Sequence, residues 1–141
     1  MKRIVICCLG LPALVCFLRA ADTPPKDRQQ SDAKEVTVKH VKPKEAEKLV
    51  AEHKVTVLDI RTPDEFAEGH IAGATNVNYL SSSFARQISS LPKTNAYLVH
   101  CASGNRSTKS LKIFSQQHFD SIYHLDGGFE AWKEAGLPVA K

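Results

Sequence analysis

The chain has 141 residues, enough for one folded domain with a short appendage but not for two independent cores. Charged residues make up 24% and hydrophobic residues 43%, which is ordinary for a globular protein. The formal net charge of +4 falls to about +1 when Lys2, Arg3 and Arg19 of the first segment are set aside, and no basic block is interleaved with aromatic residues. We therefore expect no nucleic-acid partner.

Residues 1–21 have the pattern of an export signal. Lys2 and Arg3 precede an apolar run from Ile4 to Leu18, and Ala20 and Ala21 follow as small residues suited to signal-peptide cleavage. The run is shorter than the ~20 residues that a helix needs to cross a bilayer. A retained N-terminal anchor is the main alternative, and a segment with neither role is the remaining one. We expect a periplasmic or secreted protein, with membrane contact only if the segment is retained.

Three of the four cysteines, Cys7, Cys8 and Cys16, lie in this first segment. The mature protein would then keep only Cys101, which has no partner for an intramolecular disulfide. A lone thiol in an oxidising compartment is a liability unless it is buried or used. The polar residues 22–35 that follow the signal predict a flexible linker.

From residue 36 onward, strand-like and helix-like runs alternate, and we assign residues 36–140 to one domain. Buried or β-branched runs predict strands at 36–38, 55–60, 74–77, 96–100 and 121–125. Helical spacing and end signals predict helices from Pro43 to about His53 and at 64–68, 84–91, 108–119 and 130–135, the last capped by Gly136. This alternation is typical of an α/β fold, a parallel sheet with helices on both faces.

The segment most suggestive of chemistry is the loop that joins the strand at 96–100 to the next helix. Cys101 begins it, and Ala102, Ser103, Gly104, Asn105 and Arg106 follow. Open α/β sheets bind ligands beyond the carboxyl ends of their strands. A short loop that opens a helix can direct several backbone N–H groups at one point, where they stabilise an anion together with the helix dipole. We predict that this anion is the thiolate or persulfide of Cys101 and that the thiol pKa is lowered.

Simpler interpretations exist for each of these residues. An isolated cysteine is most often a small buried hydrophobe. Arg106 is either a solvated residue or one that curls back to bind a ligand or brace the loop. His100 should face away from the loop, because neighbouring strand residues point in opposite directions, so we do not expect it to be the base. The six histidines form no i, i+4 pair and no Cys/His cluster, so no metal site is expected.

Several separate motifs make the chain similar to the rhodanese homology domain over residues 36–139. They are LDIR from Leu58, EF from Glu65, GHIAGATN from Gly69, HCASGNRS from His100, and LDGGF from Leu125 through to Trp132. The resemblance implies a rhodanese-like fold with a central five-stranded parallel sheet and catalysis at Cys101. It also implies that Asp59 and Arg61 form a strand-end pair that braces the fold near the site. Gly127 and Gly128 are expected to permit close backbone passage.

Loop length separates two chemistries among the proteins that this chain resembles. Four residues lie between Cys101 and Arg106, as in the sulfurtransferases, whereas the related cell-cycle phosphatases have a loop one residue longer. We therefore expect an exported sulfurtransferase that moves sulfane sulfur from thiosulfate or a related donor to cyanide or a thiol, including a protein thiol. The only cofactor-like species is the covalent persulfide on Cys101. The alternatives are a non-catalytic binding or sulfur-sensing module and, less favoured, a phosphatase. Because Arg106 is the only charge in the loop, affinity for the thiosulfate dianion is expected to be modest.

Overall fold

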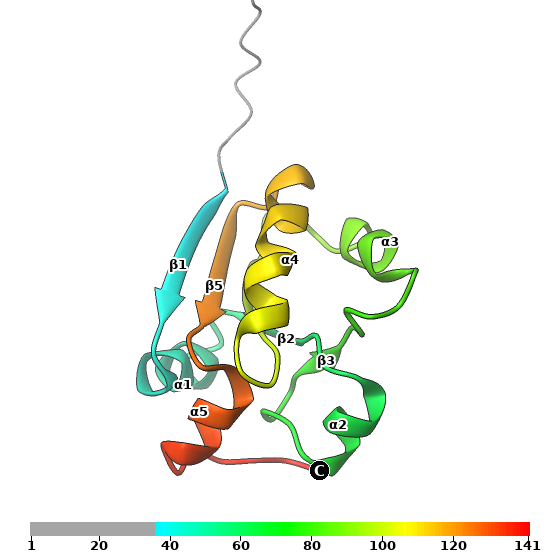
Figure 1. Ribbon diagram of the computed structural model, residues 1–141. Coiled ribbons are helices and arrows are strands. Elements are labelled where there is room, and N and C mark those ends of the chain that lie inside the picture. Colours follow the sequence, from blue (N-terminus) through cyan, green and yellow to red (C-terminus); the bar gives the residue numbers. More distant parts are fainter. Residues whose placement is uncertain (1–35) are drawn as a thin grey trace, which may run out of the picture. The chain divides into compact units, whose positions relative to one another are not determined.

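A computed structural model describes residues 36–141. The predicted export signal and linker, residues 1–35, lie outside the described residues. In the described part of the chain, strands and helices alternate in the order β1 (Thr37–Val41), α1 (Pro43–Ala51), β2 (Thr56–Asp59), α2 (Pro63–Glu68), β3 (Thr75–Asn76), α3 (Phe84–Ser89), β4 (Ala96–His100), α4 (Asn105–Gln116), β5 (Ser121–Leu125) and α5 (Gly128–Glu134) (Figure 1). No helix within residues 36–141 is both long and apolar enough to cross a membrane.

The five strands form one sheet in the order β1-β5-β4-β2-β3, and every neighbouring pair is parallel. The prediction of a five-stranded parallel sheet is therefore confirmed. In such a sheet all strands end at the same edge. The loop that begins at Cys101 follows β4, the central strand, so it lies at the middle of that edge with β2 and β5 on either side.

Helices cover both faces of the sheet, and side chains of β4 alternate between the two core layers. Tyr97 and Val99 pack in the layer that α3 and α4 cover, whereas Leu98 packs in the layer that α1 and α5 cover. This alternation follows from the two-residue period of a strand. Cys101 continues the first set, so its side chain lies on the α4 side of the sheet.

Several element boundaries differ from the prediction. Helix α4 begins three residues before position 108, and α5 begins two residues before position 130. Each is preceded by a glycine in the left-handed region, Gly104 with φ 98° and Gly127 with φ 74°, which turns the chain directly into the helix. Strand β1 extends to Val41 because it pairs with β5 along its whole length. Helix α1 ends at Ala51 and His53 has φ 51°, so the prediction that this helix extends to about His53 is wrong.

Candidate functional site

The thiol of Cys101 lies at the N-terminus of α4. Cys101 is only 1% exposed and belongs to the core layer under α4, so it is a buried residue as well as a loop residue. The N–H of Gly104 donates to Sγ at 3.2 Å, and the hydroxyl of Ser107 donates to Sγ at 3.6 Å. The sulfur therefore sits where the backbone and the first turn of a helix provide donors.

The contacts of Cys101 favour its thiolate. Burial alone would raise the pKa of the Cys101 thiol, because it disfavours the charged form. The N–H and O–H of Ser107 and the N–H groups of Gly104 and Arg106 act in the opposite direction and outweigh it, so the thiol pKa lies below its ordinary value. The dipole of α4, whose N-terminus faces the sulfur, has the same sign of effect. The lowered pKa follows the direction predicted from the sequence.

The first turn of α5 is hydrogen-bonded to the loop that begins at Cys101. The N–H of Phe129 donates to the carbonyl of Cys101 at 2.8 Å, and the N–H of Glu130 donates to the carbonyl of Ala102 at 2.9 Å. Within one trans peptide the N–H points away from the C=O. The amides of Ala102 and Ser103 are therefore turned away from α5, and within residues 36–141 neither has a hydrogen-bond partner. They are free to bind an anion or an added sulfur atom.

Gly128 makes this close approach possible. Its φ is +62°, and a Cβ atom there would lie 2.6 Å from the carbonyl oxygen of Cys101 and 2.5 Å from that of Ala102. No side chain fits at that position without displacing the loop. The close backbone passage expected at Gly127 and Gly128 is thus confirmed for Gly128.

Arg106 is bound to a carboxylate that lies 41 positions earlier in the chain. Its guanidinium donates to both oxygens of Glu65, at 2.8 and 2.7 Å. Glu65 also completes a capping box with Thr62 at the start of α2. The bond to Arg106, followed by those to Thr62, lowers the pKa of Glu65 from 4.5 to about 2.

The pair changes the expected role of Arg106. Glu65 first, and the nearby Cys101 to a smaller extent, raise the pKa of Arg106, so the guanidinium faces both groups. The sequence identifies Arg106 as the only charge in the loop, and the structure gives that charge a carboxylate partner. Arg106 therefore fits the bracing role better than the role of an anion ligand. Sequence reasoning missed Glu65 as a residue of the site, although it lies in one of the matching motifs.

Asp59 and Arg61 form the buried pair that the resemblance implies. Arg61 donates to both carboxylate oxygens of Asp59 at 2.6 to 3.0 Å and to the carbonyl of Gly69 at 2.7 Å. The guanidinium also lies 4.0 Å from the ring centroid of Phe129. These contacts join the end of β2 to the end of α2 and to α5, which is a bracing geometry beside the loop.

His100 lies on the side of β4 opposite the thiol, as the alternation of strand residues predicts. Its ring is fully buried between Asp59 and Phe129, with Nε2 3.8 Å from an Asp59 oxygen. Burial lowers the pKa of His100, so the ring is neutral near pH 7. It has no contact with Sγ that would let it act as the base.

A hydrogen-bonded group beside the loop was missed by sequence reasoning. The hydroxyl of Ser107 lies 2.9 Å from Nε2 of His124, and Nδ1 of His124 lies 3.2 Å from Oδ1 of Asp126. Nδ1 of His40 lies 2.8 Å from the same oxygen. Ligand atoms of His40, His124 and Asp126 all lie within 4.8 Å of one another, and among the described residues this is the group with metal-ligating character. Spacing along the sequence gave no sign of it, because His40 lies in β1 whereas His124 and Asp126 lie in β5 and directly after it.

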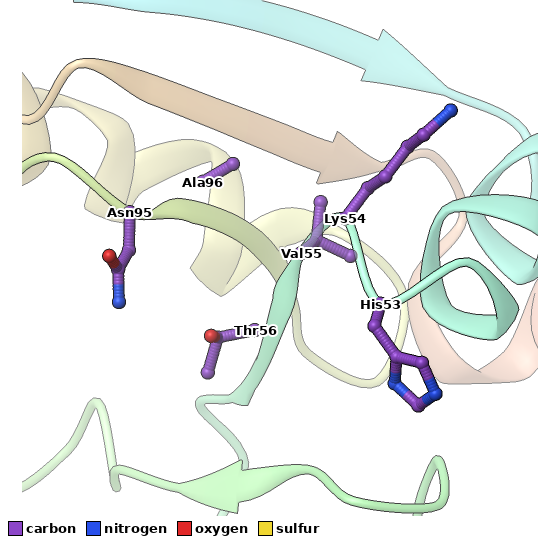
Figure 2. A pocket seen from close by; sticks show the side chains of 6 residues that line it. All are labelled: His53, Lys54, Val55, Thr56, Asn95 and Ala96. Carbon is purple, nitrogen blue, oxygen red and sulfur yellow. The ribbon is translucent and has the colours of Figure 1, made fainter.

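A separate hollow lies at the other end of the sheet. It has a volume of about 260 Å³ and is lined by His53, Lys54, Val55, Thr56, Asn95 and Ala96 (Figure 2). These residues precede or begin β2 and β4, whereas Cys101 follows the end of β4. The hollow is therefore not part of the thiol site.

Known proteins share both the sequence pattern and the fold. The family described as Rhodanese-like domain matches residues 42–135. The chain is 37% identical over 97 residues to thiosulfate sulfurtransferase GlpE of Pseudomonas aeruginosa, covering 69% of this chain and 86% of that protein. It is 36% identical over 101 residues to thiosulfate sulfurtransferase 16, chloroplastic, of Arabidopsis thaliana, covering 64% and 82%.

Solved structures agree with the sequence relatives. A rhodanese-related protein from Thermoplasma volcanium superposes with a TM-score of 0.65 at 29% identity, covering 72% of this chain and 97% of that one. A rhodanese-like domain protein from Staphylococcus aureus gives 0.62 at 28% identity, covering 73% and 99%. Family, fold and relatives agree with the arrangement around Cys101: the chain belongs to the rhodanese-like family, as a thiosulfate sulfurtransferase-like enzyme.

Proposed function

We propose that this protein moves sulfane sulfur from thiosulfate or a related donor to an acceptor through a persulfide on Cys101. The observation that carries the proposal is the position of Sγ at the N-terminus of α4, with the N–H of Gly104 directed at it from 3.2 Å. Donors arranged in this way stabilise a thiolate before the reaction and a persulfide anion after it. The chemistry needs no cofactor beyond the covalent intermediate.

The reaction proceeds in two displacements. The Cys101 thiolate attacks the outer sulfur of thiosulfate; a new S–S bond forms, the S–S bond of thiosulfate breaks, and sulfite leaves with its electron pair. Cyanide then attacks the outer sulfur of the persulfide, so that thiocyanate forms and the Cys101 thiolate is restored. A thiol acceptor, whether small or on a protein, leaves as a persulfide in the same way. This sequence requires ping-pong kinetics.

Roles in the loop follow from its hydrogen bonds. Cys101 is the nucleophile, and the amides from Ala102 to Arg106 hold the added sulfur. The amides of Ala102 and Ser103 support this role, since neither has a partner within residues 36–141. Arg106, held by Glu65, keeps the loop in shape. Affinity for the thiosulfate dianion is therefore modest, because the only cation of the loop already has a counter-charge.

A thiosulfate:cyanide assay tests the proposal. The wild-type protein should form thiocyanate with parallel double-reciprocal lines, and Cys101→Ser should form none. A wild type that binds thiosulfate without turnover would establish the non-catalytic binding or sulfur-sensing module instead. Hydrolysis of a phosphate ester by the wild type but not by Cys101→Ser would establish the phosphatase.

We also propose that the protein is exported to the periplasm or secreted. The proposal rests on the charged start, the apolar run and the small residues of segment 1–21. The mature protein should begin near Ala21 and contain one titratable thiol. Cell fractionation with N-terminal sequencing measures both, and full-length chain in the cytosolic fraction would contradict export. Full-length chain in the membrane fraction would indicate the retained anchor.

A further inference from the structure

Two strands bring a pair of histidines and a carboxylate together at the carboxyl end of the sheet. His40 of β1 and His124 of β5 are register partners, so their side chains project to the same face. Their ring centroids lie 4.9 Å apart, with the ring planes at 56°. Asp126 is two positions beyond His124 and returns to that face. These residues, the His40–His124–Asp126 cluster, lie outside the loop that holds the thiol.

We propose that the His40–His124–Asp126 cluster binds a divalent transition-metal ion of the zinc type. Oδ1 of Asp126 lies 2.8 Å from Nδ1 of His40 and 3.2 Å from Nδ1 of His124, and the three ligand atoms lie within 4.8 Å of one another. A tetrahedral ion with bonds of about 2.0 to 2.2 Å needs ligand atoms about 3.3 Å apart. The side chains of His40 and Asp126 are about half exposed, so small shifts of both would bring the ligand atoms to that spacing.

The hydrogen bonds at Nε2 of His124 leave Nδ1 as the ring nitrogen that faces Asp126. The hydroxyl of Thr108 donates to the carbonyl of Gly104 at 2.9 Å, and the single proton of the Ser107 hydroxyl has both that carbonyl, at 2.9 Å, and Sγ of Cys101, at 3.6 Å, as acceptors. Nε2 of His124 lies 2.9 Å from the Ser107 oxygen, and in the tautomer with its proton on Nε2 it donates to that oxygen. In that tautomer the lone pair of Nδ1 is directed at the carboxylate of Asp126, 3.2 Å away, so that a metal ion between the two could bind both.

The same pattern is characteristic of metal-ligating histidines. Such a histidine donates the N–H of its other ring nitrogen to an oxygen, which fixes the tautomer and the ring orientation. Ser107 provides that oxygen for His124. His124 is 4% exposed, so its ring is also held in place by packing.

Access and charge suit a cation from solvent. The side chains of His40 and Asp126 are 55% and 48% exposed, so an ion can enter and keep water in its open coordination positions. The carboxylate of Asp126 is the acidic member of the cluster and gives a cation an anionic ligand. Two imidazoles with one carboxylate favour zinc, nickel, copper or iron over calcium and magnesium, which prefer oxygen ligands.

Titration of the full chain with Co²⁺, followed by visible absorption, tests the site directly. We expect one saturable Co²⁺ with a d–d spectrum of nitrogen and oxygen ligands, displaced by Zn²⁺. Loss of an outer hydrogen-bond partner costs a metal site about 10- to 100-fold in affinity. Loss of a ligand in His40→Ala or Asp126→Asn should therefore weaken Co²⁺ binding by at least about 100-fold. His53→Ala removes an exposed histidine far from the cluster and should change nothing.

Two outcomes would overturn the proposal. One is the absence of a Co²⁺ spectrum in the wild type. The other is binding that survives His40→Ala, above all with the near-ultraviolet charge-transfer bands of thiolate ligands, which would assign the metal to cysteines. His40 lies on an edge strand with an exposed side chain, so His40→Ala alone decides the question if Asp126→Asn fails to fold. The result does not depend on whether the protein transfers sulfur.

Discussion

Replacing Gly128 with alanine should separate the cost of a left-handed residue from the cost of displacing the thiol loop. The new Cβ would lie 2.5 and 2.6 Å from the carbonyl oxygens of Ala102 and Cys101, which are backbone atoms that cannot rotate away. The loop must then move away from α5. That movement stretches the bonds from Phe129 and Glu130 that hold it.

The expected loss of stability in Gly128→Ala follows from these contacts. Any L-residue in the left-handed region costs about 1 to 2 kcal/mol. Each backbone hydrogen bond lost adds about 0.5 to 1.5 kcal/mol. The free energy of unfolding should therefore fall by about 2 to 5 kcal/mol in Gly128→Ala.

Gly136 provides the matched control. Its φ is +70°, close to that of Gly128, and a Cβ there would have no atom within 4 Å. Gly136→Ala should lose only the left-handed cost of about 1 to 2 kcal/mol and should keep its full rate of sulfur loading. In Gly128→Ala, misplacement of the loop by about 1 Å should slow loading by on the order of 100-fold.

Urea denaturation measures the stabilities, and the rate of sulfite release from thiosulfate measures loading. Equal stabilities and equal loading rates in the two alanine variants would refute the claim that α5 positions the loop through Gly128.

Other predictions concern the ion pair and the thiol. Glu65→Gln should lower the free energy of unfolding by about 1 to 2 kcal/mol at pH 7, because the part-buried partner of Arg106 loses its charge. Since the pKa of Glu65 falls from 4.5 to about 2 on folding, this contribution is present above pH 4.5 and is lost as the pH falls toward 2. Equal urea midpoints for the wild type and Glu65→Gln at pH 7 would contradict the predicted loss of stability. The rate of alkylation of Cys101 by iodoacetamide should fall as the pH falls through a thiol pKa below the ordinary value. Ser107→Ala should shift that alkylation profile to higher pH. Ser110 is a buried serine one turn later in α4, and Ser110→Ala should leave the profile unchanged. Coincident profiles of the wild type and Ser107→Ala would show that Ser107 does not act on the thiol.

Local pattern was enough to predict the central part of the fold. Strands β4 and β5 have the bounds expected, because each is a compact buried run between turn signals. The starts of α4 and α5 were missed because Gly104 and Gly127 act as left-handed helix caps, whereas glycine in a sequence is commonly read as loop. The end of β1 was missed because Lys39 and His40 are polar, and their strand conformation comes from pairing with β5.

Part of the candidate site could likewise be predicted from local sequence, and part depends on tertiary packing. The position of Cys101 after a buried strand and before a helix is a property of adjacent residues, and it predicted the lowered thiol pKa. The pairing of Arg106 with Glu65 depends on how α2 packs beside the loop, which no local pattern encodes. The His40–His124–Asp126 cluster depends on the register of β1 against β5, strands that are far apart in the chain.

The intact mass of the purified protein before and after incubation with thiosulfate tests the persulfide of Cys101 most directly. The account predicts a gain of one sulfur atom, about 32 Da, which cyanide removes. Cys101→Ser, folded as judged by circular dichroism, should show no gain. A wild-type protein that never gains this mass with thiosulfate or another sulfane donor, or a folded Cys101→Ser protein that still does, would contradict the account.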